Sequence, residues 1–228
     1  RASHHNHILA VDLKENTRFP NAQPYILYMV DCFTRFKMAC FIPNKKATTI
    51  SERLFTHWIK LFGPPQYLHS DRGREFVNDE VQKLCELHGI KVTNTAARTP
   101  NANGLCEKQH FWIDKMMEKL SIVHPDCSPE ILLGWCVHAA NTLDMRSGYS
   151  PHMLVFGKNP IHPSLAHPNP TMSDDPELSK TLAENINMMY KAREAYIQCE
   201  SDHAIREALK QRMYTRAENI QLQDWIYF

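Results

Sequence analysis

The sequence predicts an α/β fold: a five-stranded mixed sheet flanked by helices and followed by a long helical segment. Short apolar runs rich in β-branched and aromatic residues alternate with longer stretches whose apolar residues recur at helical spacing. The first three apolar runs follow one another directly, whereas helical stretches separate the later ones. This order is typical of a mixed sheet and not of a repeat or a sandwich.

Five segments have the composition and length of strands. Two of them are joined so closely that they are expected to be antiparallel neighbours, and a turn that contains two prolines precedes this pair. In order, the expected strands are residues 8–13, 25–33, 36–43, 66–70 and 90–95.

Four segments in the first 150 residues have helical periodicity, namely residues 46–63, 78–89, 105–123 and 128–143. Thr48 or Thr49 is a candidate cap for the first of them, and Ser128 followed by Pro129 is a typical helix start. Residues 96–104 carry little side-chain bulk and are expected to form a loop.

The chain changes character after Pro151, and three regions are expected. Residues 1–160 form the core, and residues 161–216 form a proline-containing linker and a long helical segment. Residues 217–228 resemble the start of a further, truncated domain. The charges of the helical segment are mixed in sign, so most of its surface is expected to face solvent.

Composition excludes little. The 228 residues carry a net charge of +1, which neither indicates nor excludes nucleic-acid binding. No apolar run approaches the roughly 20 residues that span a bilayer, and the first residue is not Met, so a fragment of a longer intracellular protein is expected. The seven cysteines lack zinc or disulfide spacing and are expected to be reduced. His4, His5 and His7 suggest a solvated segment or an incidental metal patch.

Three carboxylates stand where chemistry is expected. In "YLHSDRGREF", Asp71 ends an apolar strand, and Asp12 ends the first strand, which is a candidate neighbour in the same sheet. Glu107 follows Asp71 after 35 intervening residues and opens a helix. Carboxylates that converge repel one another unless cations lie between them, and hard divalent ions prefer oxygen ligands. Spacing alone equally allows two strand-end caps and a first-turn partner of the helix dipole.

The flanking text resolves this choice. Residues 5–160 resemble the catalytic core of retroviral and retrotransposon integrases, most specifically in "HSDRGREF", in "NG" before the glutamate with its 35-residue gap, and in "SGYSPHMLVFG". The resemblance implies a ribonuclease-H-like fold and a metal-dependent enzyme that processes DNA 3′ ends and joins them to target DNA. Residues 217–228 would then begin an SH3-like domain.

The resemblance also implies residue roles. Asp12, Asp71 and Glu107 would be the catalytic residues and would hold two Mg²⁺ or Mn²⁺ ions. Asp31 is the rival for the first position, but it matches a strand position of the family that binds no metal. The expected partners are DNA, as element ends and target, and further copies of the chain, with action in the nucleus and no membrane.

A loop of the family that contacts DNA matches "TPNANG". Asn103, Gly104 and Lys108 are therefore candidate DNA contacts, although Asn103 is equally a candidate helix cap, Gly104 a hinge, and Lys108 a solvated lysine.

Two departures weaken the transfer of DNA contacts. Arg72 stands where the family usually has asparagine or glutamine, and Asp114 stands where it often has lysine. An integrase-derived host protein that binds nucleic acid or protein without catalysis is therefore the alternative. Another ribonuclease-H-like nuclease is disfavoured by "SGYSPHMLVFG".

Overall fold

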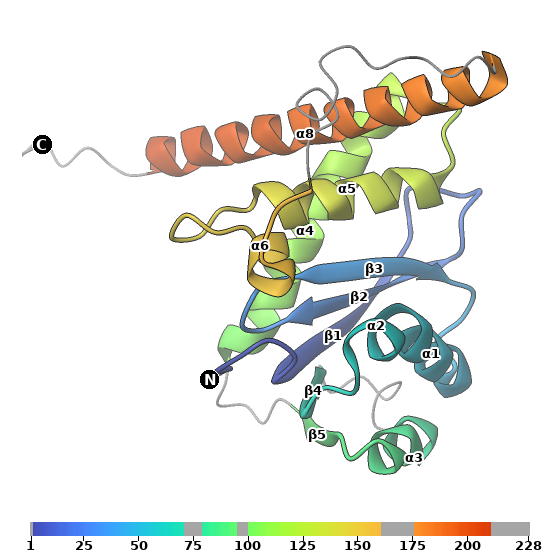
Figure 1. Cartoon of the computed structure of the whole chain (residues 1–228), viewed down its shortest axis with the longest axis vertical. Coiled ribbons are helices and arrows are strands. Elements are labelled where there is room, and N and C mark those ends of the chain that lie inside the picture. The colour runs from blue at the N-terminus through green and yellow to red at the C-terminus, as the bar shows by residue number, and fades with distance from the viewer. Residues whose placement is uncertain (1, 71–78, 95–99, 161–175, 211–228) are drawn as a thin grey trace, which may run out of the picture.

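The computed structural model describes residues 2–70, 79–94, 100–160 and 176–210, and in parts of the helices at the edges of these ranges only the backbone. Figure 1 shows a central sheet with helices on both faces. In chain order the elements are β1 (Ile8–Glu15), β2 (Tyr25–Asp31), β3 (Lys37–Ile42), α1 (Ala47–Leu54), η1 (Phe55–Ile59), α2 (Lys60–Phe62), β4 (Tyr67–Ser70), α3 (Asp79–Leu87), β5 (Lys91–Asn94), α4 (Pro100–Val123), α5 (Pro129–Leu143), α6 (Pro151–Phe156) and α8 (Pro176–Lys210).

The sheet is mixed, as expected. Its strand order is β3-β2-β1-β4-β5. β1, β2 and β3 form an antiparallel meander, whereas β4 pairs parallel with β1 and β5 pairs parallel with β4. The parallel pairs are connected through helices, because a parallel crossover needs a connection of a dozen or more residues.

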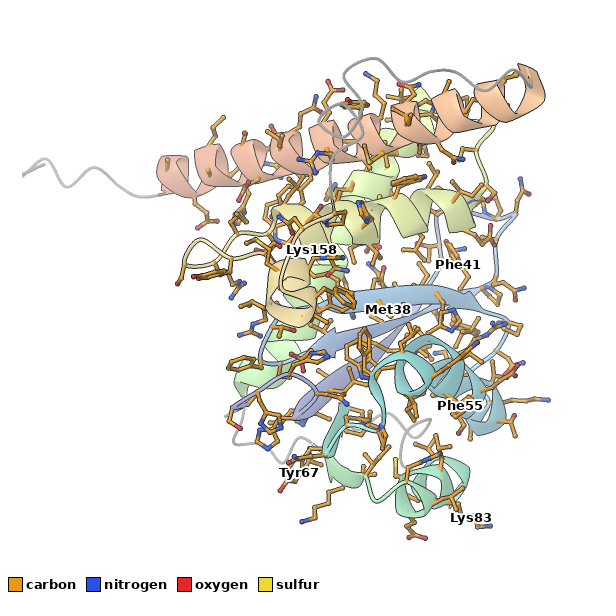
Figure 2. All side chains as sticks on the ribbon, in the orientation of Figure 1. Met38, Phe41, Phe55, Tyr67, Lys83 and Lys158 are labelled. Atoms are coloured by element: carbon orange, nitrogen blue, oxygen red, sulfur yellow. The ribbon has the colours of Figure 1, made fainter. Side chains whose placement is uncertain are left out.

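The alternation of side chains along the strands divides the core between the two faces of the sheet. Leu27 and Met29 belong to the cluster beneath α1, η1 and α3, and Ile26 and Tyr28 belong to the cluster beneath α4, α5 and α8. Figure 2 shows side chains filling the space on both faces; the labelled Met38 and Phe41 of β3 contribute to the first and the second cluster.

One of the two predicted helix starts is confirmed. Ser128 caps α5 by accepting a hydrogen bond from the backbone N–H of Ile131 at 3.3 Å, with Pro129 in the first turn. The expected cap by Thr48 or Thr49 is wrong, because α1 starts after Lys46 without a side-chain cap.

The expected loop 96–104 is wrong from Pro100 onward, because α4 already begins there. Proline suits the first position of a helix, where its missing N–H costs no hydrogen bond. Asn103 therefore lies inside α4 and is not its cap, and Gly104 lies inside the same helix.

The long helical segment is one helix, α8, which lies across α4 and α5 on the outer side of the molecule (Figure 1). The expectation that it is mostly solvated misses a buried stripe on α8. The stripe consists of Met188, Met189, Ala192, Ala195, Tyr196 and Cys199. No described helix has the length and apolarity needed to cross a membrane.

Candidate active site

Asp12 lies where the central strand β1 loses its pairing with β4. The parallel pairing ends at Val11 and Ser70, the last residue of β4, while β1 continues beside β2 to Glu15. Asp12 is therefore not at the end of β1, as the sequence suggested, but it is the first residue of β1 beyond the pairing with β4. Its side chain is 29% exposed, so a ligand can reach it.

The carboxylate of Asp12 is oriented by two contacts. Its Oδ1 accepts a hydrogen bond from the backbone N–H of Leu13 at 2.8 Å. Its Oδ2 lies 3.1 Å from Nδ1 of His110, which is on α4. The second contact fixes the middle of α4 against the centre of the sheet.

His110 is a neutral, buried ring. Burial, and after it the charge of Lys14, lowers the pKa of His110 from its ordinary 6.5 to about 3. A neutral imidazole carries one proton, and the neighbouring carboxylate of Asp12 places it on Nδ1 as a donor. The ring stacks on Tyr28 with centroids 3.9 Å apart, and Tyr28 is the β2 residue that pairs with Asp12.

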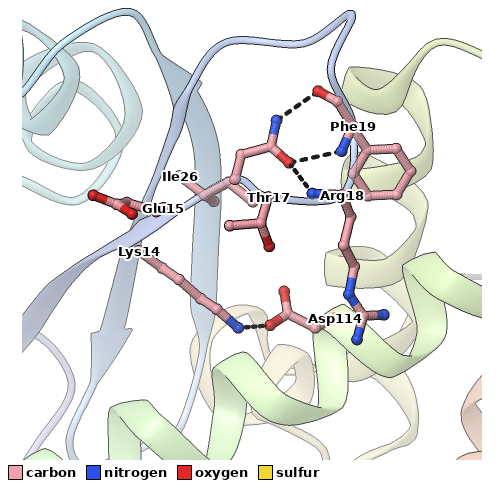
Figure 3. A pocket seen from close by; sticks show the side chains of 8 residues that line it. Lys14, Glu15, Thr17, Arg18, Phe19, Ile26 and Asp114 are labelled. Carbon is pink, nitrogen blue, oxygen red and sulfur yellow. Dashed lines mark hydrogen bonds and ion pairs between the residues drawn. The ribbon is translucent and has the colours of Figure 1, made fainter.

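A second set of polar contacts joins β1, β2 and α4, two residues after Asp12 in β1 and four residues after His110 in α4. Asp114 of α4 forms an ion pair with Lys14 and accepts a hydrogen bond from the hydroxyl of Tyr28 at 3.0 Å. Burial, with the charge of Asp114, raises the pKa of Tyr28 well above its ordinary value. Figure 3 shows Lys14 and Asp114 pointing toward each other, and both residues line a small cavity of about 30 Å³.

These contacts with Lys14 and Tyr28 explain why an aspartate is accommodated at position 114. The family's usual lysine is absent from α4, but β1 supplies Lys14 opposite the same position, so the pair retains one charge of each sign. Sequence reasoning missed His110 and Lys14. The available signals were that His110 follows Glu107 by three residues, and that Lys14 follows Asp12 by two, so each pair shares a face of its element.

Asp31 is a structural residue. It is fully buried, and its Oδ2 accepts from the backbone N–H of Thr34 at 2.6 Å and from the Thr34 hydroxyl at 2.7 Å. Its Oδ1 accepts from the backbone N–H of Asn6 at 2.9 Å. These bonds hold the β2–β3 turn, which supports the preference for Asp12 over Asp31 as the first aspartate.

The other predicted site residues are placed only in part. Asp71 directly follows Ser70 in the sequence and lies outside the described residues. Glu107 and Lys108 lie in α4, where Glu107 is one turn before His110 and on the same side of the helix. Asn103 and Gly104 lie in the first two turns, and the side chains of these four residues are not described.

Of the three expected metal ligands, the structure describes the side chain of Asp12, and this side chain suits a divalent ion. Asp12 offers a reachable carboxylate, the ligand type that Mg²⁺ prefers. Among the described residues, no group of three or more His, Cys, Asp or Glu side chains could hold a metal. Two of the three expected ligands are outside that set.

The N-terminal histidines pack against protein side chains. The rings of His4 and His7 stack with centroids 4.9 Å apart, and the hydroxyl of Ser3 is 3.0 Å from Nδ1 of each. His5 packs edge-on against Phe62. This segment is therefore less solvated than the sequence suggested.

The described cysteines are free thiols, four of them buried: Cys40, Cys85, Cys136 and Cys199. Burial raises the pKa of Cys40 and Cys85 to about 11, so both remain protonated near neutral pH. Neither is suited to act as a nucleophile.

Comparison with known sequences finds similarity to the family that the motifs suggested. Residues 2–100 match the integrase core domain family. The chain is 27% identical over 140 residues to the retrovirus-related Pol polyprotein from transposon 412 of Drosophila melanogaster, covering 60% of this chain and 11% of that protein. It is 26% identical over 156 residues to the Pol polyprotein of Radiation murine leukemia virus (strain Kaplan), covering 68% of this chain and 26% of that protein. The chain thus spans about a quarter or less of these relatives.

Solved structures confirm the fold. The HTLV-2 integrase catalytic core domain in complex with magnesium (trimeric form) superposes with a TM-score of 0.58 at 21% identity, covering 68% of this chain and 99% of that one. A chain of the simian T-cell lymphotropic virus intasome in complex with PP2A regulatory subunit B56 gamma superposes with a TM-score of 0.63 at 20% identity, covering 77% of this chain and 62% of that one. The mixed sheet with its flanking helices is the ribonuclease-H-like fold of integrase catalytic cores.

Proposed function

We propose that this chain, whose core is of the integrase catalytic type, carries out metal-dependent 3′-end processing and strand transfer of DNA for a retrotransposon or a related mobile element. One observation carries the proposal: the side chain of Asp12 is partly exposed where the pairing of β1 with β4 ends, and Nδ1 of His110, on the helix of Glu107, lies 3.1 Å from its carboxylate. Asp12 is on β1, Glu107 is on α4, and Asp71 follows the last residue of β4 in the sequence.

The register supports convergence of the two aspartates. Ser70 pairs with Val11, the residue before Asp12, and Asp71 is bonded to Ser70. The strands run parallel, so the residues that follow the last β1–β4 pair in each strand would lie at the same end of this pairing. Glu107 is the remaining member, one turn of α4 before the residue that contacts Asp12.

The metal requirement follows from the ligand chemistry. Asp12, Asp71 and Glu107 would hold two Mg²⁺ or Mn²⁺ ions, and bound metal supplies Lewis-acid stabilisation of charge on the phosphoryl oxygens. His110 and the backbone N–H of Leu13 orient the carboxylate of Asp12. The magnesium of the HTLV-2 core domain supports this assignment.

The chemistry needs no covalent enzyme intermediate. Water attacks a phosphodiester near the element end, and the leaving oxygen becomes a free 3′-hydroxyl. This hydroxyl then attacks a phosphodiester of target DNA, forming the joint and releasing a new 3′-hydroxyl. The protonated, buried thiols of Cys40 and Cys85 are not required for either step.

The partners in this proposal are DNA and further copies of the chain. Asn103, Gly104 and Lys108, in the first turns of α4, would contact DNA beside the carboxylates. The described relatives occur as dimeric and trimeric core domains and in an intasome, which supports assembly into a multimer. Action would take place in the nucleus.

The first prediction is that Glu107→Gln and Asp71→Asn each abolish activity. We would measure cleavage and joining on a branched oligonucleotide that mimics the joined product, in Mg²⁺, Mn²⁺ and EDTA. Losing a ligand removes several kcal/mol of charge stabilisation, so the rate should fall about 100-fold or more. EDTA should abolish activity of the unsubstituted chain.

The matched control is Glu130→Gln, an exposed glutamate in the first turn of α5, which should keep full activity. If Glu107→Gln or Asp71→Asn retained full metal-dependent activity, the assignment would be wrong.

A specific observation favours a second candidate, an integrase-derived protein that binds nucleic acid or protein without catalysis. Both oxygens of Asp12 already have partners, and His110 contacts the one that faces α4. A metal ion would have to share or displace that contact. If the unsubstituted chain binds DNA and remains inactive in Mg²⁺ and Mn²⁺, this second candidate is favoured.

A further inference from the structure

A groove of about 250 Å³ runs between α4 and α8, on the side of α4 that does not face the sheet. We call it the α4–α8 groove. Its aromatic and basic side chains are Phe111, Trp112, Lys115, Lys119, His203 and Arg206. Phe111 and His110 are adjacent in α4, so one turn of helix contributes both to the candidate active site and to the groove.

The aromatic side chains form an open platform. Phe111 is 48% exposed, although it is a large apolar residue on a helix. The ring of Trp112 lies at 76° to that of Phe111, with centroids 6.2 Å apart. The ring of His203 meets Trp112 edge-on at 5.2 Å. The platform therefore presents ring surface from both helices.

The charges of the groove leave a surplus of cations. Glu118 is paired with Arg18 at 2.7 Å and with Lys115 at 2.9 Å. Asp202, the second acidic residue of the groove, is paired with Lys119 at 3.0 Å. Arg206 is exposed and forms no ion pair with a described residue. An anionic ligand would therefore meet a cation without displacing an acid.

The groove starts beside the expected metal ligands. Phe111 follows Glu107 by four residues, so about 6 Å of helix rise separates them. A polynucleotide strand held at Glu107 passes within one nucleotide of Phe111 if it follows α4. Neighbouring nucleotides of a strand bound at the active site are thus within reach of the groove.

From these features we propose that the α4–α8 groove binds an unpaired nucleotide of the DNA strand held at the active site, with its base stacked on Phe111 and its phosphate near Arg206. The inference rests on the proposed function and names the form of DNA that the site takes. Unpaired bases stack on aromatic side chains while basic residues follow the backbone. A cavity of about 250 Å³ suits one nucleotide better than the row of side chains that a docked helix presents.

The test compares two DNA hairpins that carry the same number of phosphates. One has a single-stranded tail of two thymidines, and the other has a tail of two abasic nucleotides. Binding of the full 228-residue chain is measured by fluorescence anisotropy in EDTA, so no cleavage occurs. The thymidine tail should bind about fivefold tighter or more, in line with base stacking on an aromatic ring.

Two substitutions test the base contact and the phosphate contact separately. Phe111→Ala should remove the preference for the thymidine tail, whereas Phe33→Ala, which truncates a ring of similar exposure on the β2–β3 turn, should keep it. Arg206→Gln should weaken both tailed hairpins relative to a blunt one, and Lys180→Gln, on an exposed position of α8, should not. Circular dichroism checks that each variant is folded.

Each contrary outcome has a separate meaning. Equal binding of the two tails by the unsubstituted chain would overturn the groove proposal and leave the proposed function intact, because cleavage is measured independently. Failure to bind any of the hairpins would overturn both. An acidic amphipathic peptide of leucine and glutamate that binds the unsubstituted chain and not Phe111→Ala, without a tail preference, would assign the groove to a protein partner.

Discussion

Lys37 is an ammonium group enclosed by the fold. It is 1% exposed, and its Nζ lies 3.3 Å from Asp144, which also lies 3.7 Å from Nε of Arg146. Burial lowers the pKa of Lys37 from 10.5 to about 8; Asp144 opposes this shift, and Arg146 and Arg35 add to it. Burial, together with the charges of Arg146 and Arg35, outweighs the attraction of Asp144, so the charged form of Lys37 is destabilised in the folded state.

The resulting prediction concerns pH. Because the folded-state pKa lies below the unfolded one, the unfolded chain binds more protons between pH 8 and 10.5, and the contribution of Lys37 to stability rises with pH in this window. The shift corresponds to about 3 kcal/mol. In urea denaturation, the stability of the unsubstituted chain relative to Lys37→Met should rise by about that amount between pH 7.5 and 10.5. If the stabilities of the unsubstituted chain and of Lys37→Met changed equally with pH, the prediction would be wrong.

The site residues show what sequence can specify at the residue scale. A sequence motif marks Asp12, and its role as a metal ligand stays a prediction, whereas the buried contacts of Asp31 give that residue a structural role. His110 and Lys14 were not predicted, because their partners are about 100 residues away in the chain. Such pairs depend on how α4 lies on the sheet, and spacing within one element does not encode that.

At the scale of elements, Asn141 joins α5 to the edge strand β3. Its Oδ1 accepts from the backbone N–H of Lys37 at 2.9 Å, and its Nδ2 donates to the carbonyl of Lys37 at 2.8 Å. Both backbone groups face away from β2, where β3 has no further strand in the described sheet. The side chain thus completes the hydrogen bonds of an edge and fixes the helix at one register.

We expect Asn141→Ala to destabilise the protein by roughly 2–4 kcal/mol, because two buried backbone groups lose their partner. Urea denaturation followed by tryptophan fluorescence measures the change. The control is Asn187→Ala on the exposed side of α8, which should stay within about 0.5 kcal/mol of the unsubstituted chain. A similar small effect at Asn141 would mean that α5 does not depend on this contact.

Whether a segment is a helix or a strand was largely predictable from the sequence, but where a helix begins and which of its residues are buried were not. The apolar periodicity gave the strands and the main helices, because it reports directly on which side is buried. The start of α4 at Pro100 was missed, since small residues suit a loop as well as a helix. The buried stripe of α8 was missed because two of its six residues, Ala192 and Ala195, are alanines, which do not stand out as apolar in the sequence.

At the scale of the whole molecule, α8 is part of the core. Its buried residues belong to the same hydrophobic cluster as α4, α5 and one face of the sheet. Ala192, Ala195, Met188 and Tyr196 of α8 are buried in this shared cluster. α4 is therefore held between the sheet and α8, which fixes the helix that carries Glu107.

The last prediction tests this arrangement. Ala192 is 1% exposed, so Ala192→Glu would place a carboxylate inside the cluster that α8 shares with α4 and α5 and should either detach α8 or cost about 3 kcal/mol through overpacking and desolvation. Ala183→Glu, on the exposed side of the same helix, should be nearly neutral. Urea denaturation gives the stability, and amide hydrogen exchange shows whether α8 loses protection. Equal stability and protection in the two variants would mean that α8 folds apart from the core, and α4 would then be held by the sheet and α5 alone.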